Sequence, residues 1–520
     1  MEQSRNRAWT AAFVALVVLE CLPIWVFRHF PSQDGPSHLY NAAVMANWRS
    51  QPLYQQYYAV RLTPAGNLLF QLLLAGMIRT MPLSLIEPVL LTGYIILCAV
   101  AFRVLLSQTA GPRAGPFSVF AAIFAANSFF QTGFWNFMFS IPLALLALVY
   151  YLRGRTRRTP FWYAMLTLWS IAVYEMHMAS WMALAMALAV FSAGELVESH
   201  RKPGGSRTAA RALAPLLTLL PPLVLTMIFM TGSGYRSVSA DRIPETLVGR
   251  LTPLAALSFF RTLSDIDLLF TGLFGALVVA MAGLAIWARW RRAPVFQHDD
   301  LWLAIAAACA AVSVLAPSAA SGVFIRHRMA FYAWMFLVVW LSKQIWRPAF
   351  LRVCAVSVCL LAALPFFWRM PEYSRWAHSI DEFLAVGPNI RPGATVLALD
   401  MQDTWHRVNP LLHAVDWLAP KPFIDLRNYE AATTYFPTQF RSGLNPFQSL
   451  GALDELQHVP PVFHLAEYQA QTHSPVDYLL FYGRSAQIFP EQRLYGDALR
   501  NYKLTYISHP EQMVRLYEMR

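Results

Sequence analysis

The residues best suited to acid–base chemistry lie in a short stretch after the first apolar segment of the chain. Asp34 and His38 stand four residues apart in the sequence Gln33-Asp34-Gly35-Pro36-Ser37-His38. Gly and Pro favour a tight bend that Asp tolerates, which predicts that Asp34 lies on a turn. A carboxylate can accept a proton from a substrate, and an imidazole can exchange one near neutral pH. Both residues are predicted to be catalytic.

A helix is predicted directly after this turn. Ser37 is a candidate N-cap, and Tyr40 is a candidate for substrate binding. The alternative interpretation is an ordinary capped turn that leads into a helix at the membrane surface. The helix prediction rests on apolar residues at helical spacing, namely Leu39, Ala42, Ala43 and Ala46.

The composition indicates the environment in which these residues work. Of the 520 residues, 57% are hydrophobic and only 13% are charged, whereas soluble domains carry about 25% charged residues. The chain is therefore predicted to be an α-helical polytopic membrane protein. Its net charge of +12 comes largely from basic loops between apolar segments, which is typical of membrane topology and not of nucleic-acid binding. The five cysteines lie in apolar segments and indicate neither a zinc site nor a disulfide framework.

The first predicted span covers residues 9–27 and follows Arg5 and Arg7. This pattern predicts an uncleaved anchor with a cytoplasmic N-terminus. Glu20 lies inside the span and should face protein or water rather than lipid. A later apolar stretch, 62–81, is interrupted by polar residues and fits either a weak transmembrane helix or a helix on the membrane surface.

The basic loops decide between these two interpretations. With a surface helix at 62–81 the chain has about eleven spans, and the strongly basic loops, such as 153–158 and 289–292, all face the cytoplasm. If 62–81 crossed the membrane, the basic loops after the first would face outward, against the positive-inside rule. The surface helix is therefore predicted. The later spans are then 83–106, 116–130, 137–152, 160–174, 179–197, 212–230, 268–288, 300–316, 329–345 and 350–368.

The same topology defines two domains. Residues 1–368 form a transmembrane domain whose first outer loop, 28–82, carries surface helices, and residues 369–520 form an extracytoplasmic α/β domain. Apolar runs bounded by turn residues predict strands of this domain at 395–399, 476–482 and 514–517. The outer face then also carries Glu175, His177, Asp241, Asp265, Asp267, Arg326, His327 and Arg328.

Arg326, His327 and Arg328 begin a span at this outer boundary, against the positive-inside trend. An arginine there presents a planar fork that matches phosphate oxygens at the depth of a lipid phosphate. All three residues are predicted to bind substrate. The alternative is that the arginines extend toward lipid head groups without a specific ligand.

Two further outer-face positions supply candidate site residues. Glu175 and His177 end another span, where ionisable residues usually serve function. Glu175 is predicted to be catalytic and His177 to bind substrate, with a structural pair as the alternative. Trp135 and Asn136 are predicted to bind substrate because they offer stacking and hydrogen-bonding surface, although Trp is also common at membrane interfaces.

Together these features resemble the C-type (GT-C) membrane glycosyltransferases, which include bacterial relatives of protein mannosyltransferases and the aminoarabinose transferases that modify lipid A. The similarity covers nearly the whole chain: an acid just after the first span, surface helices, many spans, a late basic residue and an extracytoplasmic α/β domain. In sequence it rests on the turn around Asp34, the loop 133–137, and Arg328 with Tyr332 nearby.

The resemblance implies a function. Enzymes of this family take a sugar from a polyprenyl-phosphate carrier on the outer face of the membrane, here a bacterial inner membrane. By similarity, Asp34 acts as general base or orients the acceptor, and Arg326 or Arg328 contacts the lipid phosphate. A glycan, a lipid or a protein remains open as the acceptor.

The chain also departs from the family. Many members carry a second acid beside the first, whereas Gly35 and Pro36 follow Asp34 here. One carboxylate and one histidine make a poor divalent site, so no metal or other cofactor is predicted and a metal-independent inverting transfer is favoured. Two other functions stay open: a transporter or flippase, with Glu20 as its intramembrane charge, and a non-catalytic subunit of envelope assembly.

Overall fold

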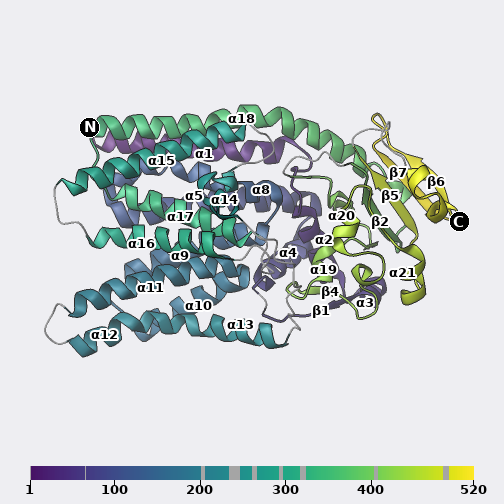
Figure 1. The fold of residues 1–520 in the computed structure, drawn as a ribbon, viewed down its shortest axis with the longest axis horizontal. Coiled ribbons are helices and arrows are strands. Elements are labelled where there is room, and N and C mark those ends of the chain that lie inside the picture. The colour runs from purple at the N-terminus through teal and green to yellow at the C-terminus, as the bar shows by residue number, and fades with distance from the viewer. Residues whose placement is uncertain are drawn as a thin grey trace. The chain divides into compact units, whose positions relative to one another are not determined.

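The computed structural model describes residues 2–64, 66–200, 205–232, 246–260, 266–291, 297–316, 324–402, 408–483 and 491–520 (Figure 1). Asp241 and Asp265 lie outside these ranges. The contacts divide the chain into two compact units. The membrane unit comprises Met1–Pro23, Leu90–Phe130 and Asn136–Met370, and the α/β unit comprises Ile24–Val89, Gln131–Trp135 and Pro371–Arg520.

Eight helical segments of the described residues are long and apolar enough to cross a membrane. They confirm the predicted polytopic helical protein. The helices that make up these segments are α1 (Glu2–Val26), α5 (Leu83–Ala110), α9 (Trp135–Gly154), α11 (Met178–His200), α12 (Gly205–Leu213) with α13 (Leu220–Gly232), α15 (Asp267–Trp290), α16 (Leu301–Leu315) and α18 (Pro348–Leu384).

Two further predicted spans are also helical. They are α10 (Pro160–Met176), with 17 residues, and α17 (Ile325–Ser342), with 18 residues. The membrane unit also contains the short helix α14 (Leu247–Ala255). Thus 160–174 and 329–345 are helical as predicted, although they do not belong to the eight long apolar segments.

The span predicted at 116–130 is wrong as a continuous helix. The chain there forms α6 (Ala114–Phe117), α7 (Phe120–Ala125) and α8 (Ser128–Thr132). Asn127 explains the break between α7 and α8, because its side chain accepts a hydrogen bond from Phe129 N at 2.9 Å and donates one to Phe124 O at 2.8 Å. Such local side-chain bonds to the backbone compete with helical hydrogen bonds.

A five-stranded sheet forms the core of the α/β unit. Its order is β3-β2-β5-β7-β6, with β3, β2 and β5 parallel and β7 antiparallel to both of its neighbours. All residues of β2 and β5 are buried, as expected for central strands. The three predicted strands are confirmed. The strands are β2 (Thr395–Asp400), β3 (Ile424–Asp425), β5 (Tyr478–Tyr482), β6 (Tyr502–Ile507) and β7 (Val514–Met519), and the helices after α18 are α19 (Tyr429–Ala432), α20 (Leu453–Gln457), α21 (Leu465–Thr472), α22 (Glu491–Leu494) and α23 (Gly496–Leu499).

The α/β unit also contains the loop that follows the first span. This loop forms α2 (Gly35–Asn47), α3 (Pro52–Tyr57), β1 (Tyr58–Val60) and α4 (Leu68–Thr80). Strand β1 pairs antiparallel with β4 (Thr438–Phe440), and α2 packs against α4. Hydropathy could not reveal this pairing, because it joins segments that lie about 380 residues apart.

Helix α4 corresponds to the apolar stretch 62–81. It has 13 residues, so at 1.5 Å per residue it is about 20 Å long, whereas the hydrocarbon core of a bilayer is about 30 Å thick. Phe70 and Leu74 are buried, while Leu72 and Leu73 are about two-fifths exposed. The helix therefore has one face packed on the protein and an apolar face that is open.

Candidate functional site

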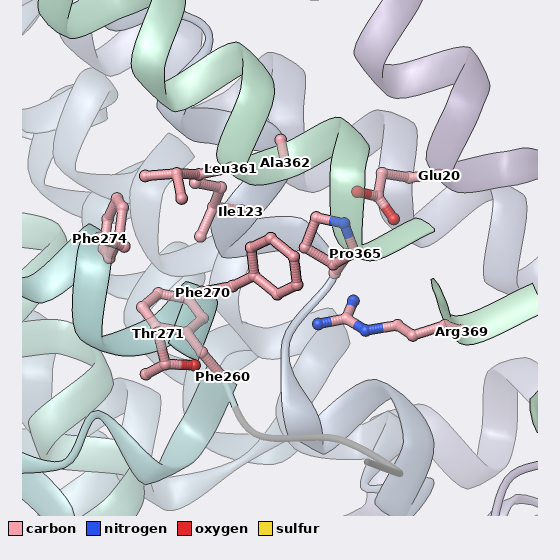
Figure 2. Close-up of a pocket in the computed structure, with 11 residues that line it drawn as sticks. Glu20, Ile123, Phe260, Phe270, Thr271, Phe274, Leu361, Ala362, Pro365 and Arg369 are labelled. Carbon is pink, nitrogen blue, oxygen red and sulfur yellow. The ribbon is translucent and has the colours of Figure 1, made fainter. Parts of the chain in front are cut away.

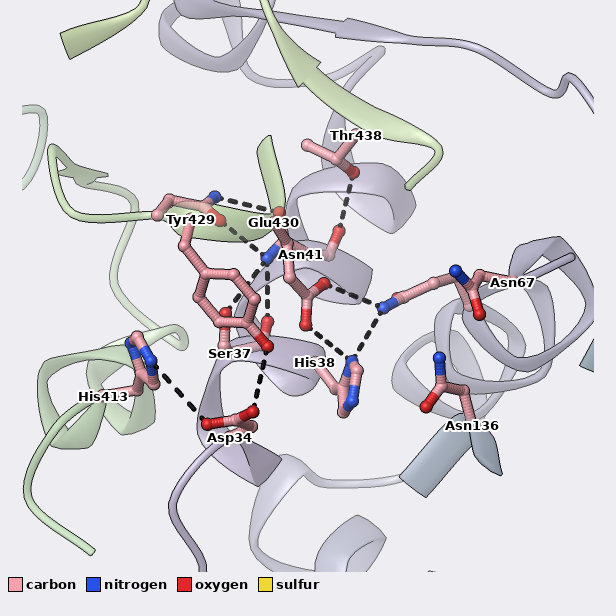
Figure 3. A network of polar contacts seen from close by, with 12 residues as sticks. Asp34, Ser37, His38, Asn41, Asn67, Asn136, His413, Tyr429, Glu430 and Thr438 are labelled. Atoms are coloured by element: carbon pink, nitrogen blue, oxygen red, sulfur yellow. Dashed lines mark hydrogen bonds and ion pairs between the residues drawn. The ribbon is translucent and has the colours of Figure 1, made fainter. Parts of the chain in front are cut away.

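Asp34 lies immediately before α2. Only 7% of its surface is exposed. The Gln33 side chain donates a hydrogen bond to Oδ1 at 3.1 Å, and the Tyr429 hydroxyl donates one to Oδ2 at 3.2 Å (Figure 3). The Nε2 atom of His413 lies 3.9 Å from Oδ1. Each carboxylate oxygen of Asp34 thus has a defined hydrogen-bond donor.

The start of the helix differs from the prediction. Asp34, not Ser37, occupies the N-cap position, and its side chain makes no capping hydrogen bond. Pro36 lies in the first helical turn. Proline is favoured there because its missing N–H has no partner within the helix. The helix therefore begins at Gly35, two residues before the predicted N-cap.

The surroundings of Asp34 tune its acidity. Burial raises the pKa of Asp34 to about 6, although hydrogen bonds from Gln33 and Tyr429 favour its charged form. Burial also lowers the pKa of His413 to about 3, so this ring is neutral and forms no ion pair with Asp34. At pH 7 Asp34 is mostly ionised, and its pKa makes it a stronger base than an exposed aspartate.

His38 is buried on α2, with its ring paired to an acid from the C-terminal part of the chain. Its Nδ1 lies 2.6 Å from Glu430 Oε1, and Gln71 donates to Glu430 Oε2 at 3.2 Å. Burial alone would lower the pKa of His38, but the Glu430 carboxylate outweighs this effect and the pKa is raised. The imidazole is therefore favoured as a cation. Aromatic rings within 5.5 to 6.1 Å of the imidazole belong to Phe70, Trp135 and Phe436.

Tyr40 and Trp135 are fully buried beside these residues. The Tyr40 hydroxyl donates to Phe423 O at 2.8 Å and accepts from Asp425 N at 3.1 Å, so it fastens α2 to β3. Trp135 packs against Gly35, where an added Cβ would lie 2.3 Å from the indole ring. The structure thus brings Asp34, His38, Tyr40 and Trp135 together in one unit.

The turn of Asp34 is supported by a second segment whose conformation requires glycine. Thr132 O accepts a hydrogen bond from Asp34 N at 3.0 Å, and Gly133 follows with a φ of 77°. A Cβ on Gly133 would lie 2.3 Å from the backbone nitrogen of Gly35. Left-handed backbone and close approach both favour glycine at this position.

Gly133→Ala is expected to lower the free energy of unfolding by roughly 1–3 kcal/mol, because backbone strain and a backbone clash act together. Gly443→Ala is the matched control, since Gly443 has a φ of 79° but nothing within 4 Å of its added Cβ. Thermal unfolding in detergent compares the two variants. An equal loss of stability in both would contradict the predicted clash between Gly133 and the Asp34 turn.

A second group of predicted site residues lies in the membrane unit. The Arg328 guanidinium carbon lies 5.1 Å from the centre of the Phe137 ring, and the His177 ring lies 5.3 Å from the same centre. Arg328 is buried, with 9% of its surface exposed. A guanidinium over an aromatic face gains a cation–π interaction. Phe137 therefore brings Arg328 and His177 into one cluster.

Arg326 is placed differently, although it is only two residues away. Its Nε donates a 2.6 Å hydrogen bond to Ala316 O, just after the end of α16, and Ser313 Oγ donates to Arg326 O at 2.8 Å. Cations are favoured at helix C-termini because they bond the last carbonyls and meet the negative end of the helix dipole. Arg326 therefore joins α17 to α16.

The remaining predicted site residues also lie in the membrane unit. Glu175 is half-buried in the last turn of α10. Asn136 is buried at the start of α9, where its Oδ1 accepts from Phe137 N at 2.8 Å. The His327 ring lies 5.2 Å from that of Phe324.

The charge inside the first span lines a cavity of the membrane unit. Glu20 and Arg369 face this cavity (Figure 2). Arg369 also donates two hydrogen bonds, of 3.0 and 3.1 Å, to Asp267 Oδ1. Opposite charges near one another are expected where ionisable residues lie within a membrane domain. The other lining residues are Ile123, Ala126, Phe260, Phe270, Thr271, Phe274, Leu361, Ala362 and Pro365.

Sequence reasoning missed His413, Tyr429 and Glu430, the C-terminal partners of Asp34 and His38. They lie about 375 to 395 residues away in the chain, so no local spacing connects them. One signal was available, because a polar run follows the carboxyl end of the buried strand β3, where α/β proteins often place functional groups. In the described ranges, no three His, Cys, Asp or Glu side chains are grouped so that they could hold a metal ion.

No protein-family model and no curated protein sequence matches this chain. Solved structures do match it. The crystal structure of ArnT from Cupriavidus metallidurans in the apo state has a TM-score of 0.55 and 11% identity, with 98% of both chains covered. The structure of the same protein bound to undecaprenyl phosphate gives 0.54 and 12%, again with 98% of both chains covered.

A third match is the archaeal oligosaccharyltransferase AglB from Archaeoglobus fulgidus, in complex with an inhibitory peptide and a dolichol-phosphate. Its TM-score is 0.48 at 12% identity, with 94% of this chain and 71% of that chain covered. The likeness to ArnT spans nearly the whole of both chains. It confirms the predicted resemblance at the level of the fold: this polytopic membrane protein has the fold of a GT-C glycosyltransferase.

Proposed function

We propose that this protein is a membrane glycosyltransferase that moves a sugar from a polyprenyl-phosphate carrier to an acceptor on the outer face of a bacterial inner membrane. The observation that carries the proposal is the buried Asp34, with a donor on each carboxylate oxygen and a pKa of about 6, beside His38. The fold shared with ArnT, which is solved with undecaprenyl phosphate bound, supports the class of donor.

The proposed reaction is an inverting displacement at the anomeric carbon of the sugar. Asp34 accepts the proton of the acceptor group as that group forms its bond to the anomeric carbon. The bond from this carbon to the phosphate oxygen breaks, and the phosphate leaves with the electron pair on its lipid carrier. A cation beside the phosphate stabilises this charge. We assign that role to Arg328, because Arg326 already bonds the end of α16.

The other candidate residues have supporting roles in this proposal. His38 and Glu175 assist proton transfer, and His177 lies beside Arg328 across the ring of Phe137. The residues assigned to substrate binding also include Trp135, Asn136, Tyr40 and His327.

A transporter or flippase is the competing function. Glu20 is the charge that would favour it, but Glu20 shares its cavity with Arg369, which accounts for its place in the membrane domain. A non-catalytic assembly subunit is the other alternative. Purified protein in nanodiscs, given polyprenyl-phosphate sugars and candidate acceptors, separates these functions. Transfer of sugar supports the proposal, whereas lipid movement across the bilayer without transfer would contradict it.

The proposed orientation of the chain rests on its basic loops. Reporters fused after residues 60 and 400 are expected to read as extracytoplasmic, and a reporter fused after residue 158 as cytoplasmic, because 153–158 contains four arginines that the positive-inside rule retains in the cytoplasm. Paired phosphatase and fluorescent-protein fusions measure this. A cytoplasmic signal after residue 400 would place the α/β unit, which contains Asp34, on the cytoplasmic side. That result would contradict the proposed site.

A further inference from the structure

Three consecutive residues of the C-terminal part, Asn428, Tyr429 and Glu430, each contact a different polar residue of the Asp34 turn and α2. This 428–430 segment lies soon after the end of β3. Asn428 is the N-cap of α19, and Tyr429 and Glu430 are its first two residues. Figure 3 shows Tyr429 beside Asp34 and Glu430 beside His38. The three pairs are Asn428 with Asn41, Tyr429 with Asp34, and Glu430 with His38.

The asparagine pair fixes the position of the segment. Asn41 Nδ2 donates to Asn428 Oδ1 at 3.0 Å, and Asn428 Nδ2 donates back to Asn41 Oδ1 at 2.9 Å. Asn428 Oδ1 also accepts from Ala431 N at 3.1 Å, which caps α19. Both asparagines are buried. Paired amides in a buried site define one relative position of the two segments, because any shift leaves polar groups unpaired.

Tyr429 then fixes the orientation of Asp34. Its hydroxyl donates to Oδ2, while the donor to Oδ1 is Gln33. Gln33 is itself held by the C-terminal part, since its Oε1 accepts from Asn409 N at 3.0 Å. The ring of Tyr429 packs 4.9 Å from that of His413. The carboxylate is therefore oriented by two hydrogen bonds, both of which depend on residues after position 400.

Glu430 fixes the ring of His38. The carboxylate lies at Nδ1, so it holds the proton on that nitrogen and fixes the orientation of the ring. The Gly133 carbonyl lies near the ring and, like Glu430, favours the charged form of His38. Glu430 itself is fully buried, and Gln71 bonds its second oxygen. A carboxylate at one ring nitrogen orients an imidazole and stabilises its cation, as the aspartate of a catalytic triad does.

We propose that the 428–430 segment is a positioning element of the active site: Tyr429 orients Asp34, and Glu430 orients His38 and favours its charged form. Residues that follow strand β3 of the α/β unit then position the groups of the proposed proton transfer. This inference rests on the proposed function for the role of Asp34. The contacts themselves do not depend on it.

The first test is Tyr429→Phe, which removes the hydroxyl and keeps the ring against His413. Asp34 is faced by Gln33, Tyr429, His38, Glu430 and His413. Loss of the Tyr429 hydrogen bond disfavours the carboxylate, so the pKa of Asp34 rises. We expect the acid limb of the kcat profile to move up by roughly one pH unit and kcat to fall about tenfold, as one hydrogen bond to a charged group predicts.

Tyr502→Phe is the matched control, since it deletes another buried phenol that donates to a backbone carbonyl, that of Val476, at 2.8 Å. It should leave the pH profile unchanged. KM for the lipid donor should change less than twofold in both variants, because neither hydroxyl is proposed to bind the donor. A wild-type profile in Tyr429→Phe, or the same shift in both variants, would overturn the role of Tyr429.

The second test needs no enzymatic activity. Glu430→Gln keeps the shape of the side chain and removes its charge, so His38 loses the carboxylate that favours its cation. Nuclear magnetic resonance of protein labelled with ¹⁵N-histidine follows the titration, and His38→Asn identifies the signal. We expect the pKa of His38 to fall by one unit or more. An unchanged titration would overturn the role of Glu430, even if sugar transfer by the wild type is established.

Discussion

Asp34→Asn is expected to reduce sugar transfer by about a hundredfold or more. Asparagine keeps the size of the side chain, and its oxygen can still accept the hydrogen bond from Tyr429. It cannot accept a proton at neutral pH, so the acceptor group loses its base. The measurement is transfer from a polyprenyl-phosphate sugar by purified protein in nanodiscs, with thermal unfolding measured alongside. A folded Asp34→Asn protein that transfers sugar at the wild-type rate would show that Asp34 is an ordinary turn residue without a catalytic role.

The side-chain length and the protonation state of Asp34 each lead to a further expected effect on activity. Asp34→Glu keeps the charge but moves it by one methylene, so it should retain only partial activity, since a base must lie within about 3 Å of its proton. In the wild type, activity should rise with pH through about 6, because burial raises the pKa of Asp34 to that value and only the ionised form accepts a proton. Activity that stayed constant between pH 5 and 7 would contradict this assignment.

Arg328→Lys is expected to weaken use of the lipid donor by about tenfold or more in kcat/KM. Lysine keeps the positive charge but loses the planar fork that bonds two phosphate oxygens, and it packs less well on the ring of Phe137. Direct binding of undecaprenyl phosphate to the purified variant measures the effect apart from catalysis. Normal expression and unfolding temperature would show that the loss is local.

Arg326→Lys serves as the contrast. Arg326 bonds Ala316 O at the end of α16, so its replacement should cost stability, roughly 1 kcal/mol, and leave donor use near the wild-type level. If Arg326→Lys and Arg328→Lys both transferred sugar as the wild type does, neither arginine would hold the phosphate. If only Arg326→Lys lost donor binding, the two assignments would have to be exchanged.

Local physical chemistry explains what the sequence could determine by itself. A span is an apolar run of about 20 residues whose transfer into lipid depends on its own composition, so hydropathy predicted the polytopic helical class and most of the helices. Buried strands were likewise predicted from short apolar runs between turn residues, as at Thr395–Asp400. The bend before Asp34 was predicted from the same stretch, but Gly35 and Pro36 begin helix α2 and do not form the predicted turn.

Tertiary structure decided everything that depends on partners far along the chain. One missed feature was local: Asn127 broke a predicted span because its side chain bonds the neighbouring backbone, which hydropathy does not register. Arg326 and Arg328 look equivalent in sequence, and only packing gives one to the end of α16 and the other to the ring of Phe137. The partners of Asp34 and His38 are Tyr429 and Glu430, almost 400 residues away. Composition and spacing carry no record of that pairing, because it exists only once the first loop and the C-terminal sheet have folded into one unit.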